Sequence, residues 1–238
     1  MGLIQKKGQE VKEAVSKDNV DLKKVFIRLK DGQSLKVRIL GVEDYVQYKA
    51  HANGYNFGIY TQPCLAPTGK ECPLCKTYEY DKEEYKDLHP SNRYLVAMAD
   101  LESKEVRVWD CSKTQLKGFI SQLDEYAQDI RDGEEMMFTF KRSGTKTSTT
   151  YTLSPIINKK QLNLLEEAYH SFDGMVVEDS FFEACLQPRT ENFIMDNLKQ
   201  GGLPVEDIFP DYVFANEGAT QETTESIEDE FDEDNPPF

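Results

Sequence analysis

The fold of this chain is organised around residues 51–75, which read HANGYNFGIYTQPCLAPTGKECPLC. The stretch holds four potential metal ligands, namely His51, Cys64, Cys72 and Cys75. Cysteines separated by two residues can bind one ion from one tight turn, and a hairpin at Asn53-Gly54 would bring His51 next to Cys64. Three thiolates and one imidazole suit Zn²⁺, and four protein ligands leave no open position for catalysis. The stretch therefore predicts one structural zinc ion per chain.

Other interpretations of these residues stay open in the sequence. They are unpaired thiols, a redox-active Cys-x-x-Cys, a disulfide, and His89 as the fourth ligand in place of His51. A zinc deaminase also combines a histidine with close cysteines, but it needs a His-x-Glu and a proline directly before the Cys-x-x-Cys. Here Ala52-Asn53 follows the histidine, and Pro73 lies inside the cysteine pair. Because the general acid–base is missing and no other catalytic grouping is evident, we predict a protein that is not an enzyme.

Composition limits the size and the compartment. A chain of 238 residues allows one full domain or two small ones with tails. No apolar run approaches the roughly 20 residues of a membrane span, and the N-terminus lacks the apolar core of a signal peptide. Five cysteines, three of them in the predicted metal site, fit a reducing cytoplasm better than a disulfide scaffold. We therefore expect a cytoplasmic protein without a membrane partner.

Charge is distributed unevenly along the chain. The net charge of −15 divides into +3 over residues 1–160 and −18 over residues 161–238. Residues 215–238 hold nine acidic side chains and no lysine or arginine, so they cannot bury enough apolar surface to order themselves. A near-neutral body with a strongly acidic end is typical of a tail that has its own role.

Hydrophobic patterns predict a β-rich core followed by helices. The predicted strands form hairpins over 25–40, 92–109 and 135–153, and a helix capped by Ser112 runs to about residue 130. From residue 160 onward helices dominate. The predicted parts are an N-terminal arm (1–22), a core (23–158) with a zinc subdomain at about 51–88, a helical extension (159–214) and a disordered acidic tail (215–238).

These elements predict a mainly β fold with α-helices, namely an oligonucleotide-binding (OB) barrel with a zinc-stapled insertion, a helical C-terminal part and a disordered tail. Binders of single strands combine a basic groove that follows the phosphates with rings on which bases stack. Both residue types are interleaved along the predicted strands. The predicted DNA contacts are Arg28, Lys30, Lys36, Arg38, Tyr48, Lys49, Tyr55, Phe57, Tyr60, Arg93, Arg107, Trp109, Lys141, Arg142 and Lys146.

A set of residues around the metal motif also matches a known pattern. They are Val37-Arg38-Ile39-Leu40, His51, Asn53-Gly54-Tyr55, Tyr60-Thr61, Cys64 and Cys72-Pro73-x-Cys75. They resemble the zinc-containing core of the T-even bacteriophage helix-destabilising protein, the gene 32 family. The resemblance covers roughly residues 35–125, and only the metal motif is specific.

This resemblance implies an OB barrel with a zinc subdomain, a cationic cleft lined by aromatic rings, and a role in replication, recombination and repair. Two features depart from the family. The loop between Cys64 and Cys72 is shorter, and the basic arm that carries cooperativity in that family has no clear counterpart in residues 1–20. The resemblance therefore does not extend to cooperative filament formation.

The C-terminus reads EDEFDEDNPPF over residues 228–238. An acidic run that ends in Pro-Phe resembles the tip of bacterial single-stranded-DNA-binding proteins. A terminal carboxylate beside a large ring suits a pocket with a basic rim, and the acidic run steers it there. The predicted partner-binding residues are Asp232, Glu233, Asp234, Pro236, Pro237 and Phe238.

Together these features predict a protein that binds single-stranded DNA largely without sequence preference. It would protect the strand and recruit replication, recombination or repair proteins (a polymerase, a helicase or a helicase loader) through its acidic tip. The rival prediction is a zinc-containing adaptor that contacts proteins only.

Overall fold

The computed structural model describes residues 20–145 and 148–212, which form a mixed α/β structure around a seven-stranded antiparallel sheet. The strands are β1 (Ser34–Arg38), β2 (Tyr45–His51), β3 (Gln62–Pro63), β4 (Ser91–Asp100), β5 (Glu105–Ser112), β6 (Phe138–Ser143) and β7 (Thr150–Pro155). Neighbours follow the order β3-β2-β4-β1-β6-β7, and β5 pairs with β4 outside this path.

The sheet does not close into a barrel in the described part of the chain, so the expected closed barrel is not observed. Closure would need β7 to pair with the free edge of β5. That edge is used by the segment before β1, because Phe26 forms a parallel bridge with Val108 and the Ile27 amide donates to the Val108 carbonyl at 2.8 Å. A backbone group already satisfied in this way has no need of another strand.

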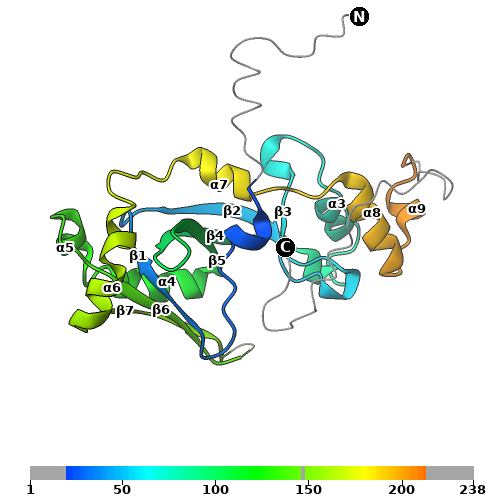
Figure 1. The fold of residues 1–238 in the computed structure, drawn as a ribbon. Coiled ribbons are helices and arrows are strands. Elements are labelled where there is room, and N and C mark those ends of the chain that lie inside the picture. Colours follow the sequence, from blue (N-terminus) through cyan, green and yellow to red (C-terminus); the bar gives the residue numbers. More distant parts are fainter. Residues whose placement is uncertain (1–19, 146–147, 213–238) are drawn as a thin grey trace, which may run out of the picture.

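Helices cover both faces and both ends of the sheet. They are α2 (Leu22–Val25), α3 (Pro73–Tyr80), α4 (Lys113–Leu123), α5 (Ala127–Arg131), α6 (Lys159–His170), α7 (Asp179–Cys185), α8 (Glu191–Gln200) and α9 (Val205–Ile208), with 3-10 turns at Tyr55–Phe57 (η1), Ala66–Thr68 (η2) and Lys86–Leu88 (η3). Figure 1 shows α4, α5 and α6 on one side of the molecule and α3, α8 and α9 on the other. Among these helices, none has the length and apolar character that a membrane crossing requires.

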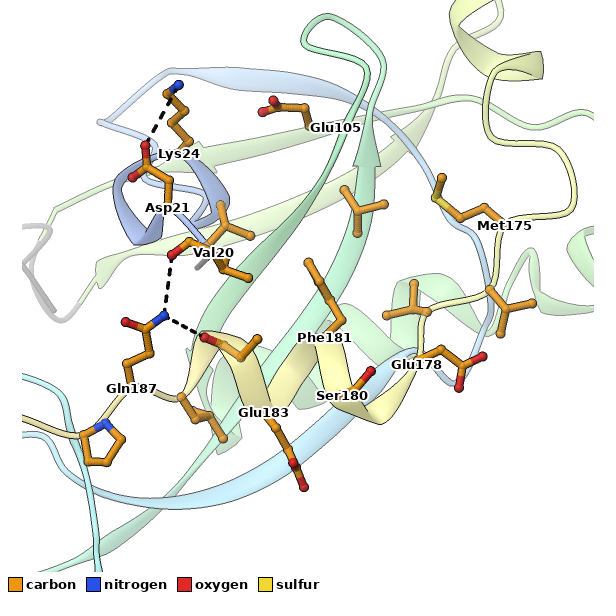
Figure 2. Close-up of a pocket in the computed structure, with 17 residues that line it drawn as sticks. Val20, Asp21, Lys24, Glu105, Met175, Glu178, Ser180, Phe181, Glu183 and Gln187 are labelled. Carbon is orange, nitrogen blue, oxygen red and sulfur yellow. Dashed lines mark hydrogen bonds and ion pairs between the residues drawn. The ribbon is translucent and has the colours of Figure 1, made fainter. Parts of the chain in front are cut away.

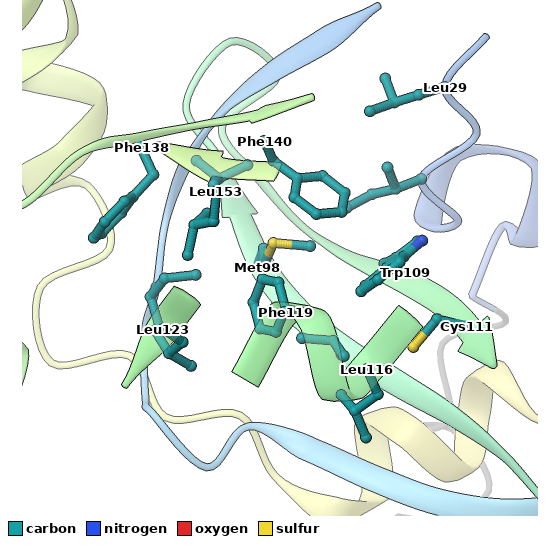
Figure 3. Packing of buried hydrophobic residues seen from close by; sticks show 14 residues of the cluster. Leu29, Met98, Trp109, Cys111, Leu116, Phe119, Leu123, Phe138, Phe140 and Leu153 are labelled. Atoms are coloured by element: carbon teal, nitrogen blue, oxygen red, sulfur yellow. The ribbon is translucent and has the colours of Figure 1, made fainter. Parts of the chain in front are cut away.

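The main core lies between the inner face of the sheet and α4 (Figure 3). Trp109 is its centre, with ring centroids 5.7 Å from Phe119, 5.0 Å from Phe140 and 4.6 Å from Tyr151. Rings at such spacings bury large apolar areas and add favourable edge contacts. Leu35, Val37 and Ile39 alternate along the chain, and all three contact this core.

Ser112 begins α4 as predicted. Its side chain accepts a hydrogen bond from the Gln115 amide, and the Gln115 side chain accepts one from the Ser112 amide, which completes a capping box. The helix ends at Leu123 rather than near residue 130, and α5 follows after a turn of three residues.

For the predicted hairpin over residues 25–40, the turn and the second strand are confirmed, but the first strand is not formed. Its turn is present, since Gly32 has φ +78° and the Gln33 amide donates to the Lys30 carbonyl. Its second half forms β1, but residues 26–30 form no strand. The guanidinium of Arg107 donates to the carbonyls of Lys24 and Phe26, so side-chain hydrogen bonds replace strand pairing there.

The helices of the predicted C-terminal extension are divided between two regions. Helix α6 packs beside β4 through Tyr169, and α7 packs with α2 on the outer face of β4 and β5 through Phe182 and Cys185. In contrast, α8 and α9 pack on the region that contains the cysteines. We define the metal lobe as residues 51–90 together with α8 and α9.

Substitution of two glycines by alanine tests the packing of the metal lobe. A Cβ on Gly54 would lie 2.7 Å from Leu88 Cδ2 and 2.9 Å from Ile59 Cβ, although its φ of −80° suits any residue. We expect Gly54→Ala to lower the free energy of unfolding by about 1–3 kcal/mol, because the metal lobe must shift to admit the methyl group. Chemical denaturation measures this change.

Gly118→Ala is the matched control. Gly118 lies inside α4, and a Cβ there would meet nothing within 4 Å. The same methyl group should raise the free energy of unfolding by about 0.5–1 kcal/mol through helix propensity. Equal effects at the two sites would contradict the packing described here.

Candidate metal centre and the adjoining aromatic cluster

Four side chains converge in the metal lobe with the geometry of a metal site. The ligand atoms of His51, Cys64, Cys72 and Cys75 all lie within 4.8 Å of one another, and the first three side chains are buried. Cys64 Sγ lies 3.4 Å from Cys75 Sγ, and His51 Nε2 lies 3.4 Å from Cys72 Sγ and 3.6 Å from Cys75 Sγ. A tetrahedral zinc with Zn–S of about 2.3 Å separates its sulfur ligands by about 3.8 Å. The four residues can therefore bind one metal ion.

The orientation of the histidine supports this use. His51 Nδ1 lies 2.5 Å from the Leu88 carbonyl oxygen, which can only accept a hydrogen bond. The proton therefore sits on Nδ1, and the lone pair of Nε2 points at the cysteines. Metal-binding histidines are commonly held in this way by a backbone carbonyl, which fixes the tautomer and the ring orientation.

The geometry also decides between interpretations left open by the sequence. A disulfide needs sulfur atoms about 2.05 Å apart, and all three cysteines are free here. His89 is exposed and packs edge-on against Tyr78 at 4.9 Å, outside the ligand cluster. His51 is therefore the fourth member of the cluster.

The three thiols shift the pKa values of one another. Burial raises the pKa of Cys72, but the hydrogen bond to His51 and two backbone amides outweigh it and lower the pKa to about 6. Burial raises the pKa of Cys64 and of Cys75, and the neighbouring Cys72 raises both further. One thiolate thus opposes the ionisation of the others. A divalent cation removes this conflict, because its charge favours three thiolates at once.

Local structure explains how distant residues reach this point. Strands β2 and β3 pair at Ala50–Pro63 and His51–Gln62, and the Cys64 amide donates to the Lys49 carbonyl. The hairpin is therefore present, but its loop is longer than the tight turn predicted at Asn53-Gly54. Cys72 precedes the first turn of α3, in which Pro73 occupies the first helical position.

The metal lobe has a core of its own. Leu74 and Leu88 pack with Ile194, Met195 and Leu198 of α8, and α9 adds further apolar side chains. Gly201 lets α8 approach η1, because a Cβ there would lie 2.9 Å from Phe57 Cα. The sequence predicted helices from residue 160 onward but gave no signal that α8 packs against residues about 120 positions earlier in the chain.

Residues of the sheet and of the metal lobe together form a group around one ion pair, which we call the Arg93 cluster: Tyr48, Tyr55, Tyr60, Arg93 and Asp110. Arg93 Nε and Nη2 donate to the Asp110 carboxylate at 2.8–3.0 Å, and the Tyr48 hydroxyl donates to it at 3.1 Å. The Tyr55 and Tyr60 rings meet edge to face at 5.7 Å. Four of the five residues are predicted DNA contacts, whereas Asp110 was missed because a lone carboxylate in a strand carries no binding signal.

Electrostatics couple the members of this cluster. Burial raises the pKa of Tyr48, and the Asp110 carboxylate raises it further. Burial also raises the pKa of Tyr55, on which the charges of Arg93 and Asp110 act in opposite directions. Burial acts to lower the pKa of Arg93, but Asp110 outweighs it, so the guanidinium stays charged.

Two of the predicted DNA contacts are corrected by the structure, and two others are already held by groups of the fold. Trp109 and Arg142 are each 1% exposed, so neither can meet a base or a phosphate from solvent. Arg38 donates to the Tyr169 carbonyl and to Asp173, and it stacks on the Tyr169 ring at 4.0 Å. Arg107 is held by Asp100 and by two backbone carbonyls. The sequence placed these side chains in or next to predicted strands but gave no signal of what covers them.

The other predicted contacts fall into several groups. Phe57 is half-buried against Tyr85, and Lys36 donates to Thr139. Arg28 is half-buried. The exposed ones are Lys30, Lys49, Tyr55 and Lys141. Lys146 and the tail residues Asp232, Glu233, Asp234, Pro236, Pro237 and Phe238 lie outside the described residues.

An open groove of about 1310 Å³ runs between α2, the start of β5 and α7. Figure 2 shows acidic side chains around it, including Glu105, Glu178 and Glu183. Lys24 on its edge pairs with Asp21 at 3.9 Å. Because carboxylates repel phosphates, this groove is not a suitable site for a nucleic acid.

Comparison with known proteins gives no further guide to the site, because neither a protein-family model nor a curated protein matches the chain.

The cluster predicts the effect of removing one ligand. Cys72→Ser should abolish tight binding of one metal ion per chain, measured by elemental analysis of the purified protein. Because the ligands and α8 share one core, amide exchange should also rise over residues 191–208, while β4 and β5 stay protected.

Cys185→Ser is the matched control, since Cys185 is a buried cysteine on α7 outside the cluster. This variant should keep its metal ion and the protection of α8. Full metal content in Cys72→Ser would contradict the four-ligand site.

Proposed function

We propose that this protein binds single-stranded DNA largely without sequence preference, by means of a cationic and aromatic surface between the sheet and the metal lobe. The observation that carries the proposal is the Arg93 cluster. It joins an arginine to three tyrosines where strand β2 leads from the sheet into the metal lobe. Arginines for phosphates and rings for bases are the two components of sequence-tolerant binding to single strands.

The order of strands supports an OB-like interpretation of the sheet. Strand β1 pairs antiparallel with β4, and β4 pairs antiparallel with β5. Helix α4 follows β5, and β6 of the β6–β7 hairpin then pairs with the other edge of β1. Strands β2 and β3 are inserted between β1 and β4 in the sequence. OB folds are five-stranded, partly open Greek-key barrels that bind oligonucleotides. In this proposal, β2 and β3 lead into the insertion that contains the metal site.

Zinc is the metal we propose for the four-residue cluster. Three sulfur ligands and one nitrogen ligand in a compact buried site favour zinc over the harder cations magnesium and calcium. The role is structural, since the protein ligands fill a tetrahedral shell.

The acidic tip is proposed as the partner-binding element, which recruits replication, recombination or repair proteins. Its support is the sequence of residues 228–238, where carboxylates precede a terminal ring. Deletion of Phe238 alone should abolish capture of such partners and leave DNA affinity unchanged, because the ring fills the partner's pocket while the carboxylates steer. Partner capture that survives the deletion would refute this role.

Binding to oligo(dT) tests the central proposal. Its affinity should fall with salt, with a slope of about 0.7 per phosphate contact, and duplex DNA should compete poorly. Tyr55→Ala should weaken binding about 5- to 150-fold, the range for one stacked base, with little change in the salt slope. Fluorescence anisotropy at several salt concentrations measures both quantities.

Tyr80→Ala is the matched control, because Tyr80 is an exposed tyrosine on α3 that belongs to no part of the Arg93 cluster. Its affinity should equal that of the wild type. The rival function, an adaptor that contacts only proteins, predicts that no oligonucleotide binds at any salt concentration. That result would refute the proposal.

A further inference from the structure

Strand β5 holds two ion pairs with closely similar burial. In one, Arg93 is 21% exposed and Asp110 is 3% exposed; in the other, Arg107 is 20% exposed and Asp100 is 3% exposed. Each pair joins β4 to β5, so each could serve only to hold the hairpin together. The two arginines differ in the hydrogen bonds that they make besides the ion pair.

Each of the three nitrogen atoms of the Arg107 guanidinium donates to the fold. The guanidinium donates from Nε to the Lys24 carbonyl, from Nη2 to the Phe26 carbonyl and from Nη1 to Asp100. All three nitrogen atoms thus have partners among residues of the fold. Two of the five N–H groups remain, but no nitrogen of Arg107 is without a partner in the fold.

Arg93 is held differently. Asp110 accepts from Nε and Nη2 along one edge of the guanidinium, and within the described residues no hydrogen bond from Nη1 accompanies them. The side chain is partly exposed, and its charge acts on the pKa of Tyr55, the most exposed ring of the cluster. A guanidinium fixed along one edge presents its other edge in a set direction, which is how arginine recognises a phosphate.

Tyr48 strengthens this arrangement from the opposite strand. It faces Arg93 across the β2–β4 ladder, and its hydroxyl donates to the same carboxylate. Asp110 therefore has two donors that fix its own orientation. A buried carboxylate oriented in this way can in turn orient a long, flexible arginine at little further loss of conformational entropy.

We propose that Asp110 is a positioning residue for nucleic-acid binding, which holds the free edge of Arg93 toward a backbone phosphate of a strand whose base stacks beside Tyr55. This inference rests on the proposed function and assigns a role within the same site. For the removal of the Asp110 charge, it predicts a change in DNA affinity opposite to the change that simple electrostatics predicts. Removing a negative charge near a polyanion should tighten binding, whereas loss of the positioning contact should weaken it.

The variant Asp110→Asn keeps the shape of the side chain and removes its charge. We expect its affinity for oligo(dT) to fall about tenfold, as for the loss of one oriented arginine contact, and its salt slope to flatten by about 0.7. Arg93→Lys keeps the charge, but an ammonium group cannot bind Asp110 along one edge and a phosphate along the other, so it should weaken binding similarly. Circular dichroism and thermal unfolding show whether each variant remains folded.

Asp100→Asn is the matched control for the loss of a buried carboxylate. It should destabilise the hairpin to a similar degree while leaving the affinity and the salt slope of wild type. Unchanged or tighter binding by Asp110→Asn, or an equal loss in Asp100→Asn, would overturn the positioning role. Wild-type protein that binds no oligonucleotide would overturn the proposed function itself and this role with it.

Discussion

The metal lobe depends on the closure of one loop by four side chains. His51 ends β2 and Cys64 follows β3, so the loop between them is joined at both ends when one ion binds both residues. Cys72 and Cys75 add the start of α3 to the same point. Much of this lobe consists of short 3-10 turns and irregular chain, whose ordering entropy must be offset by something other than strand pairing. An ion bound by the four side chains would supply that free energy, and the apolar core with α8 and α9 adds to it.

The same constraint connects the metal to the proposed binding surface. Strand β2 contains both Tyr48, which contacts Asp110 of the sheet, and His51, which lies in the metal cluster. The loop that the ligands close contains Tyr55 and Tyr60, whose rings meet each other, and the charge of Arg93 acts on the pKa of Tyr55. A structural ion can therefore control a distant surface without touching the ligand, because it fixes the loop on which the rings are mounted. Rigid support of this kind is what oriented contacts require.

Features with a local cause could be predicted from the sequence. The ligand set followed from the spacing of the cysteines and His51, and the cap of α4 followed from Ser112. Features with a tertiary cause could not be predicted. Trp109 and Arg107 sit in strands that also contain exposed residues, and only the packing of α4, α2 and the segment before β1 decides that one is buried and the other is used by the backbone. For the same reason, the sequence indicated neither the closure of α8 on the metal lobe nor the carboxylate that holds Arg93.

The most direct test of this account is the affinity for oligo(dT) with and without the metal ion, at one salt concentration. Chelation should lower the affinity by an order of magnitude or more, added zinc should restore it, and circular dichroism should show that the sheet persists throughout. This result would follow from release of the loop that holds Tyr55 and Tyr60. Equal affinity before and after complete metal removal would contradict the claim that the metal centre organises the binding surface.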